Sequence, residues 1–155
     1  MLALAAHYSS AQTPTELWAD LQAAAEVLRA ARPTAVNLFW AVGRVLERVE
    51  AAQPATVEAM RTLVQAEANA ICNEDAAQNV QIGIYGQAVV PDPANIIHHC
   101  NTGALATAGY GTALGVIRRA HEEGKRVHVY VDETRPRLQG ARLTTWELQQ
   151  LGVPH

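Results

Sequence analysis

A cysteine that ends a short, mostly apolar run is the residue best placed for chemistry in this chain. Residues 95–99 form the run, Cys100 follows it, and Asn101, Thr102 and Gly103 come next. Ligands of open α/β sheets bind beyond the carboxyl ends of strands, so a strand over residues 95–99 would carry this thiol into such a position. A helix beginning at Thr102 would also point free backbone N–H groups there, and those groups attract anions. The pattern predicts a thiol beside an anion pocket.

The two cysteines of the chain differ in their surroundings. Buried cysteines commonly serve as small apolar residues, and Cys72, inside a helical run, is interpreted in this way. For Cys100, the strand end and the polar neighbours favour a reactive thiol or a polar site residue. The two cysteines have no C-x-x-C spacing, and we expect reduced thiols in a cytoplasmic protein.

Two histidines, His98 and His99, precede the cysteine. Adjacent side chains of a strand point to opposite faces, so these two imidazoles cannot easily bind one metal ion. The chain also lacks a Cys/His pair at the spacing of zinc ligands, and we expect no metal site. His99 is interpreted as a core histidine whose polar atoms are satisfied.

A charged segment, residues 132–140, follows a second alternating run at residues 126–132. If both runs are parallel strands, the segment lies at the same edge as Cys100 and should face it. Its arginine and glutamine side chains suit phosphate and sugar hydroxyl groups, although a solvated charged loop is the simpler interpretation. Arg32, which precedes a helix, is ambiguous by itself, and an exposed capping arginine is the default.

Residues 1–90 are predicted to form a helical N-terminal domain. Thr13 with Pro14 has the pattern of a capped helix start, and breaks near residues 32–34 and 53–56 begin two further helices. Pro91 and Pro93 then interrupt the helical pattern, because each proline biases its predecessor to extended structure.

Residues 91–155 are predicted to begin a Rossmann-like parallel sheet, which makes the fold class α/β. The expected order is a strand at 95–99, a helix at 102–124, a strand at 126–132 and a final helix. Thr144 and Glu147 fit a capping box for that helix, with Gly152 as its stop. The three glycines inside the first helix are interpreted as packing residues and not as a dinucleotide fingerprint: Gly109, Gly111 and Gly115.

Composition excludes two classes of partner. The formal net charge is -3 and the basic residues form no stripe, so we expect no nucleic acid partner. No apolar run approaches the roughly 20 residues that span a bilayer, so we expect no membrane partner.

Four segments carry a resemblance to a known family: residues 32–38, 99–107, 109–116 and 132–144. Together they make the chain similar to the methylthioribose-1-phosphate isomerases of methionine salvage. That family shares a superfamily with the ribose-1,5-bisphosphate isomerases and the regulatory subunits of translation initiation factor 2B. The run at residues 109–115 favours the methylthioribose branch, and the regulatory subunits generally lack the His-Cys-Asn element.

The resemblance implies a reaction and its residues. The reaction is the aldose–ketose isomerisation of 5-methylthioribose 1-phosphate, with no cofactor and a sugar phosphate as the small-molecule partner. Cys100 matches a catalytic cysteine of the family, while Arg32 and Gln139 match a substrate-binding arginine and glutamine. The resemblance also implies a helical domain followed by a Rossmann-like domain, and a homodimer for the whole enzyme.

Two family elements are missing from this chain. An upstream Arg-Gly-Ala-Pro-Ala-Ile-Gly motif and a downstream catalytic aspartate have no counterpart, and neither Asp92 nor Asp132 takes the aspartate's place. We therefore expect an internal fragment of the isomerase, truncated at both ends and inactive alone. A ribose-1,5-bisphosphate isomerase and a non-catalytic domain that senses sugar phosphates or nucleotides remain as alternatives.

Overall fold

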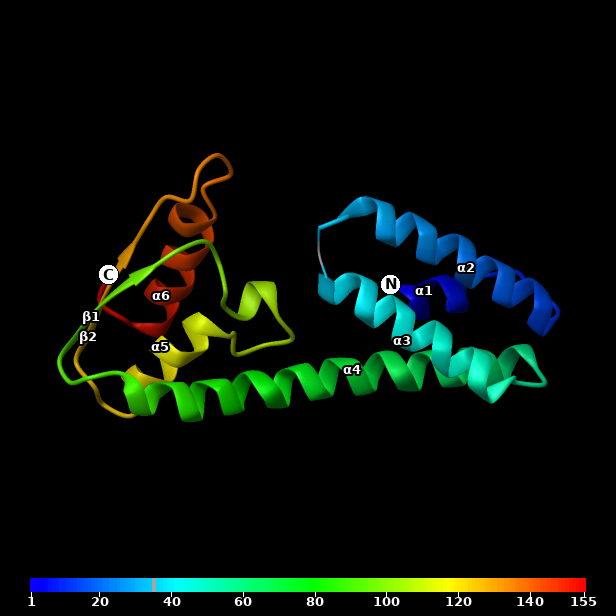
Figure 1. The fold of residues 1–155 in the computed structure, drawn as a ribbon, viewed down its shortest axis with the longest axis horizontal. Helices are drawn as coiled ribbons and strands as arrows, with labels where there is room; N and C mark the ends of the chain where they lie inside the picture. Colours follow the sequence, from blue (N-terminus) through cyan, green and yellow to red (C-terminus); the bar gives the residue numbers. More distant parts are fainter. Residues whose placement is uncertain (35) are drawn as a thin grey trace. The chain divides into compact units, whose positions relative to one another are not determined.

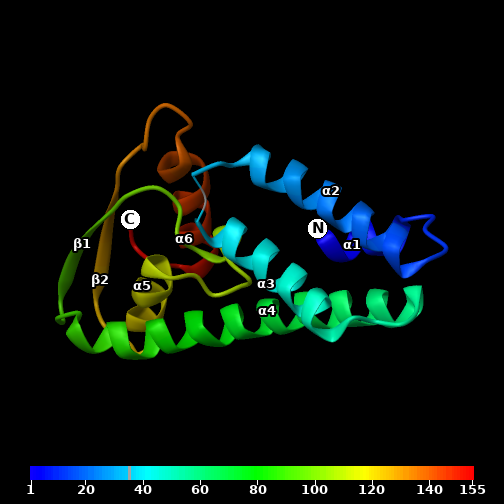
Figure 2. The same ribbon diagram turned by 45° about the vertical axis from the view of Figure 1, so that its right-hand side comes forward.

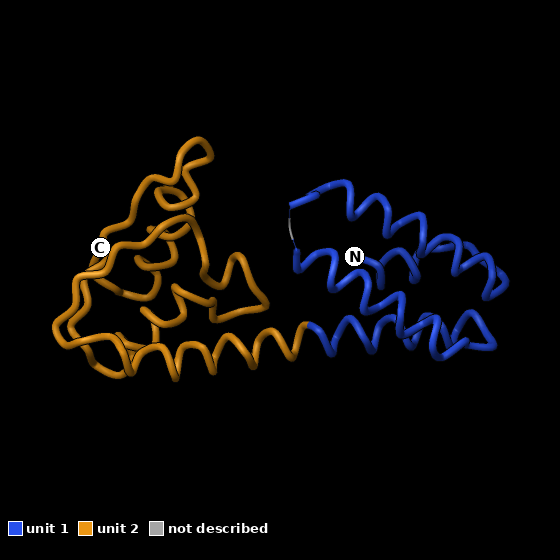
Figure 3. Tube along the Cα trace, in the orientation of Figure 1, with its two compact units in different colours: residues 1–71 blue, residues 72–155 orange. Residues whose placement is uncertain are grey.

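The computed structural model describes residues 1–34 and 36–155. These residues form helices and a small parallel sheet (Figure 1), which confirms the α/β class. They divide into two compact units, residues 1–71 and residues 72–155 (Figure 3). This division falls inside one long helix, whereas the sequence pattern placed the domain boundary at residue 90, before Pro91. The boundary at residue 90 stays a prediction.

The first unit is helical, as predicted. Its helices are α1 (Leu2–Tyr8), α2 (Pro14–Ala31), α3 (Val36–Ala52) and the start of α4 (Val57–Gly86). Thr13 caps α2 in a capping box with Glu16, and the Thr56 hydroxyl accepts a hydrogen bond from the Ala59 N–H at 3.1 Å. One face of each helix is buried in a common core that includes Leu17, Leu21, Val45, Val49 and Val64.

The second unit is built on two parallel strands. Strands β1 (Ala94–His98) and β2 (Val127–Val131) pair in register from Ala94 opposite Val127 to His98 opposite Val131. Helices α5 (Ala113–Glu122) and α6 (Thr145–Leu151) lie on the same side of this sheet (Figures 1 and 2). On the other edge of β2, the Val129 N–H donates to the Pro154 carbonyl at 2.9 Å.

Strand β1 is buried on one face only. Helices α5 and α6 cover the face that carries Ala94, His98 and Val129. On the opposite face, Ile97 is 82% exposed and Tyr130 is 57% exposed. The alternation follows from the strand's period of two, because no helix of the described residues covers the second face.

The helix predicted for residues 102–124 begins much later, at Ala113. A short 3-10 helix, η2 (Ala104–Ala106), and a turn precede it. Gly109 and Gly111 have φ angles of 105° and 94° and lie in that turn, so reading them as helix residues was wrong. A Cβ on Gly111 would lie 2.6 Å from the Cα of Gly103, so this close approach of two backbone segments requires glycine.

The start of the final helix also differs from the prediction. A π-helical segment, η3 (Gly140–Thr144), runs directly into α6, and Thr144 has helical backbone angles and caps nothing. The predicted capping box is therefore wrong, and both Thr144 and Glu147 direct their side chains to other partners. Gly152 ends α6 with φ of 70°, as predicted.

Gly140 is expected to be indispensable for this part of the fold. A Cβ at this position would overlap the Asp132 carbonyl, whereas a Cβ on Gly43, in α3, would meet nothing closer than 3.9 Å. We expect Gly140→Ala to lower the free energy of unfolding by about 2 kcal/mol or more, because backbone must move to admit the methyl group. Gly43→Ala should be neutral or stabilising by about 1 kcal/mol.

Urea unfolding of the complete gene product that carries residues 1–155 measures both effects. Equal midpoints for the two alanine variants would contradict the close approach of Gly140 to Asp132.

Candidate active site

Cys100 lies directly beyond the carboxyl end of β1 and is held by two hydroxyl groups. It is half-buried and has φ of 66°, a left-handed conformation that costs a non-glycine residue roughly 1–3 kcal/mol. Its N–H donates to Thr134 Oγ1 at 2.8 Å, and its carbonyl accepts from Thr144 Oγ1 at 2.5 Å. Strained backbone of this kind concentrates at functional sites. The predicted position of Cys100, beyond the carboxyl end of a strand, is confirmed.

The segment after β2 meets Cys100 through Thr134. The Thr134 hydroxyl donates to Asp132 Oδ1 at 2.5 Å, and His99 Nδ1 lies 2.6 Å from Asp132 Oδ2. The hydrogen bond from Thr134, followed by that from His99, lowers the pKa of Asp132 below its ordinary value. A chain of hydrogen bonds therefore joins the Cys100 backbone to a charged carboxylate at the sheet edge.

Glu147 has a structural role at this edge that the sequence did not indicate. Its carboxylate is only 7% exposed although it comes from α6. Oε2 accepts from the Ala104 N–H at 2.8 Å, and Oε1 accepts from Asn101 Nδ2 at 2.8 Å and from the Leu105 N–H at 3.4 Å. The carboxylate therefore fixes the turn that follows Cys100.

The anion pocket predicted at Thr102 and Gly103 is corrected by the same contacts. The backbone N–H groups beyond Gly103 are already bound to Glu147, and the helix that would supply further ones begins only at Ala113. A phosphate at this turn would have to displace a carboxylate whose oxygens approach Gly103 so closely that a Cβ there would overlap them.

His98 is buried and His99 is exposed, so the interpretation of His99 as a core histidine was wrong. His98 is the core histidine, 4% exposed, with Nε2 2.9 Å from Thr102 Oγ1. His99 is exposed and pairs with Asp132. Thr102 Oγ1 also accepts from the Leu114 N–H at 3.0 Å, so this residue caps α5 from outside the helix.

Protonation of His98 is expected to destabilise the protein. Burial lowers the pKa of His98 below its ordinary value of 6.5, so the folded state favours the neutral imidazole. The stabilisation is complete above the unfolded-state pKa and is lost as the pH falls through the lower, folded-state value.

Urea midpoints between about pH 5 and pH 8 test this, with His98→Gln as the control that keeps a polar atom near Thr102 but cannot titrate. The difference in midpoint between the two proteins should change on the acid side only. A difference that is independent of pH would argue against a titrating His98.

The remaining predicted site residues fall in different units. Gln139 is half-buried and immediately precedes Gly140, which packs on the Asp132 carbonyl, so it shares the sheet edge with Cys100. Arg32 is exposed at the end of α2 in the first unit. The binding roles of Gln139 and Arg32 stay predictions. Cys72 is exposed on α4, so the interpretation as a packing residue was wrong.

No group of three or more His, Cys, Asp or Glu side chains in residues 1–34 and 36–155 is arranged to hold a metal ion. Within the same residues, every helix is too short or too polar to cross a membrane.

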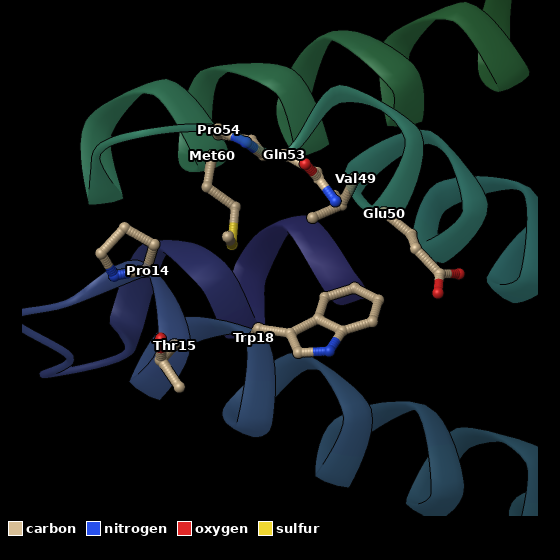
Figure 4. Close-up of a pocket in the computed structure, with 8 residues that line it drawn as sticks. All are labelled: Pro14, Thr15, Trp18, Val49, Glu50, Gln53, Pro54 and Met60. Carbon is tan, nitrogen blue, oxygen red and sulfur yellow. The ribbon is translucent and has the colours of Figure 1, made fainter.

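A hollow of about 370 Å³ opens in the first unit (Figure 4). Trp18 of α2 and Met60 of α4 belong to its apolar lining, and Glu50 of α3 also lines it. None of the residues predicted to act on substrate lines it. The remaining lining residues are Pro14, Thr15, Val49, Gln53 and Pro54.

Comparison with known proteins identifies the family of this chain. The model of the Initiation factor 2 subunit family matches residues 1–155. The chain belongs to this family. Among family members, the methylthioribose-1-phosphate isomerase of Desulforamulus reducens is 58% identical over 134 residues, which cover 86% of this chain and 39% of that protein.

Two solved structures of the Initiation factor 2 subunit family resemble the chain. The 5-methylthioribose 1-phosphate isomerase from Pyrococcus horikoshii OT3 has a TM-score of 0.87 and 42% identity, over 99% of this chain and 43% of that chain. The translation initiation factor eIF-2B subunit delta from A. fulgidus has a TM-score of 0.82 and 42% identity, over 99% and 44%. The chain spans about two fifths of the length of the curated relatives it matches, between 39% and 45%.

Proposed function

We propose that the protein is an aldose–ketose isomerase that converts 5-methylthioribose 1-phosphate into 5-methylthioribulose 1-phosphate in methionine salvage. The observation that carries the proposal is Cys100, held in a left-handed conformation at the carboxyl edge of the parallel sheet. The names of relatives at 58% and 54% identity support the substrate. The two cysteines, which form no disulfide, support a cytoplasmic location.

The substrate chemistry defines what the site must do. The anomeric oxygen carries the phosphate, so the ring must open before hydrogen can move between C2 and C1. In the proposed site, Cys100 lies beside the reacting carbons and takes part in this movement. The Gln139 amide can bond sugar hydroxyl groups, and the Arg32 guanidinium suits a phosphate, which it can bind through two parallel hydrogen bonds.

Substrate choice tests the proposal against its nearest alternative. We expect the complete gene product to have a kcat/KM for 5-methylthioribose 1-phosphate at least about 100-fold above that for ribose 1,5-bisphosphate, because a site that buries a methylthio group leaves a second phosphate unpaired. Equal turnover of the two sugars, or a preference for the bisphosphate, would reject the methylthioribose branch.

A regulatory subunit is the second candidate function. The observation that favours it is the similarity to the A. fulgidus structure, whose title names a subunit of translation initiation factor eIF-2B. A regulatory protein has no need of a reactive thiol, so the importance of Cys100 for turnover separates the two candidates.

A further inference from the structure

The backbone conformation of Cys100 needs support from outside its own strand. Its φ of 66° lies in the left-handed region, where a residue with a Cβ is disfavoured. Such a conformation persists only where surrounding contacts over-determine it. Both polar groups of the Cys100 backbone have partners, and both partners are threonine hydroxyls.

Thr134 holds the N–H side of Cys100. Its hydroxyl carries a single hydrogen, which is committed to Asp132 Oδ1 at 2.5 Å, so a lone pair is left to accept the Cys100 N–H at 2.8 Å. Asp132 is in turn fixed by His99 Nδ1 at 2.6 Å. Thr134 itself has φ of 55°, which is rare for a β-branched residue, so this contact joins two strained positions.

Thr144 holds the carbonyl side. Its side chain is completely buried, and its hydroxyl donates to the Cys100 carbonyl at 2.5 Å while it accepts from Asn101 Nδ2 at 3.3 Å. Asn101 also donates to Glu147. The two threonines therefore reach Cys100 from the segment after β2 and from the end of η3, 34 and 44 residues further along the chain.

We propose that Thr134 and Thr144 are positioning residues that lock the Cys100 backbone in its left-handed conformation and thereby aim the thiol at the substrate. The part of the proposal that concerns substrate rests on the proposed function. The lock itself, and its effect on the thiol, do not depend on which reaction the protein catalyses.

The matched variants remove a hydroxyl and keep the shape. Thr134→Val preserves the β-branched side chain and its backbone strain but loses the hydrogen bonds, and Thr134→Ser keeps the hydroxyl. Thr144→Val makes the equivalent change on the carbonyl side. Thr145→Val is the control, because the Thr145 hydroxyl donates to the Ala141 carbonyl on the exposed side of the same segment.

Two quantities are measured for each variant of the complete gene product. The first is the rate at which iodoacetamide alkylates Cys100, followed by mass spectrometry of the peptide that carries it, so that no other thiol of the complete gene product contributes. We expect Thr134→Val to change this rate by about threefold or more, since the accessibility and surroundings of the thiol set its reactivity. The second is kcat/KM, which we expect to fall about 100-fold while KM changes less, because a misplaced group costs turnover. Thr134→Ser and Thr145→Val should match the unchanged protein in both.

Unchanged alkylation in Thr134→Val, with the protein folded, would overturn the proposal. If Thr144→Val fails to fold because its site is fully buried, Thr134→Val still decides. Altered alkylation in a protein that turns over no sugar phosphate would uphold the lock and reject the proposed function instead.

Discussion

Replacing Cys100 with serine is expected to reduce kcat/KM for 5-methylthioribose 1-phosphate by about 10²–10⁴-fold, the range that a positioned proton-transfer group contributes. Serine keeps the size of the side chain and loses the acidity of the thiol. The fold should survive, because the hydrogen bonds of Thr134 and Thr144 to residue 100 involve its backbone. Steady-state kinetics and a thermal melt of the complete gene product measure the two effects.

The exposed cysteine provides the matched control. Cys72→Ser changes the same chemical group on α4 and should leave kcat/KM unaltered. Turnover of Cys100→Ser within about threefold of the unchanged protein would remove the thiol from the mechanism, and the regulatory candidate would then be favoured.

The largest effect on stability is expected from Glu147→Gln, with a loss of about 2–4 kcal/mol. The carboxylate accepts bonds from three N–H donors with two oxygens, and hydrogen bonds to a charged group contribute about 1.5–3 kcal/mol each. Glutamine offers one oxygen, and its NH₂ group would face a donor. The turn after Cys100 should loosen as a result, so kcat/KM should fall as well.

Glu133→Gln is the control for the loss of charge. The Glu133 side chain is 59% exposed and pairs with Arg135, so its replacement should cost less than about 1 kcal/mol. Urea unfolding compares the two variants. A Glu147→Gln midpoint equal to that of Glu133→Gln would mean that the buried carboxylate does not hold the turn.

Several local signals in the sequence led to correct predictions. Thr13 with Pro14 marked the start of α2, and Gly152 marked the end of α6, because caps act within a few residues. The position of Cys100 followed from the apolar run before it and from the general rule for sheet edges.

The predictions failed where the local structure depends on contacts with residues that are far away in the sequence. Glu147 lies 43 residues from Ala104, so its spacing after Thr144 suggested a local capping box when the carboxylate in fact binds another segment. Gly109 and Gly111 lie in a turn with positive φ angles and not in the predicted helix, and Gly111 packs there on Gly103, which is distant from it in backbone path but close in space. Likewise, the choice between His98 and His99 as the core residue depended on which face α5 and α6 cover.

The most direct test of the proposed reaction follows the phosphate by phosphorus NMR while the complete gene product acts on 5-methylthioribose 1-phosphate. We expect the signal of the anomeric phosphate to disappear and that of a primary phosphate ester at C1 to appear in equal amount, with no free phosphate. A substrate signal that persists at high protein concentration, or that is replaced by inorganic phosphate, would contradict an aldose–ketose isomerase.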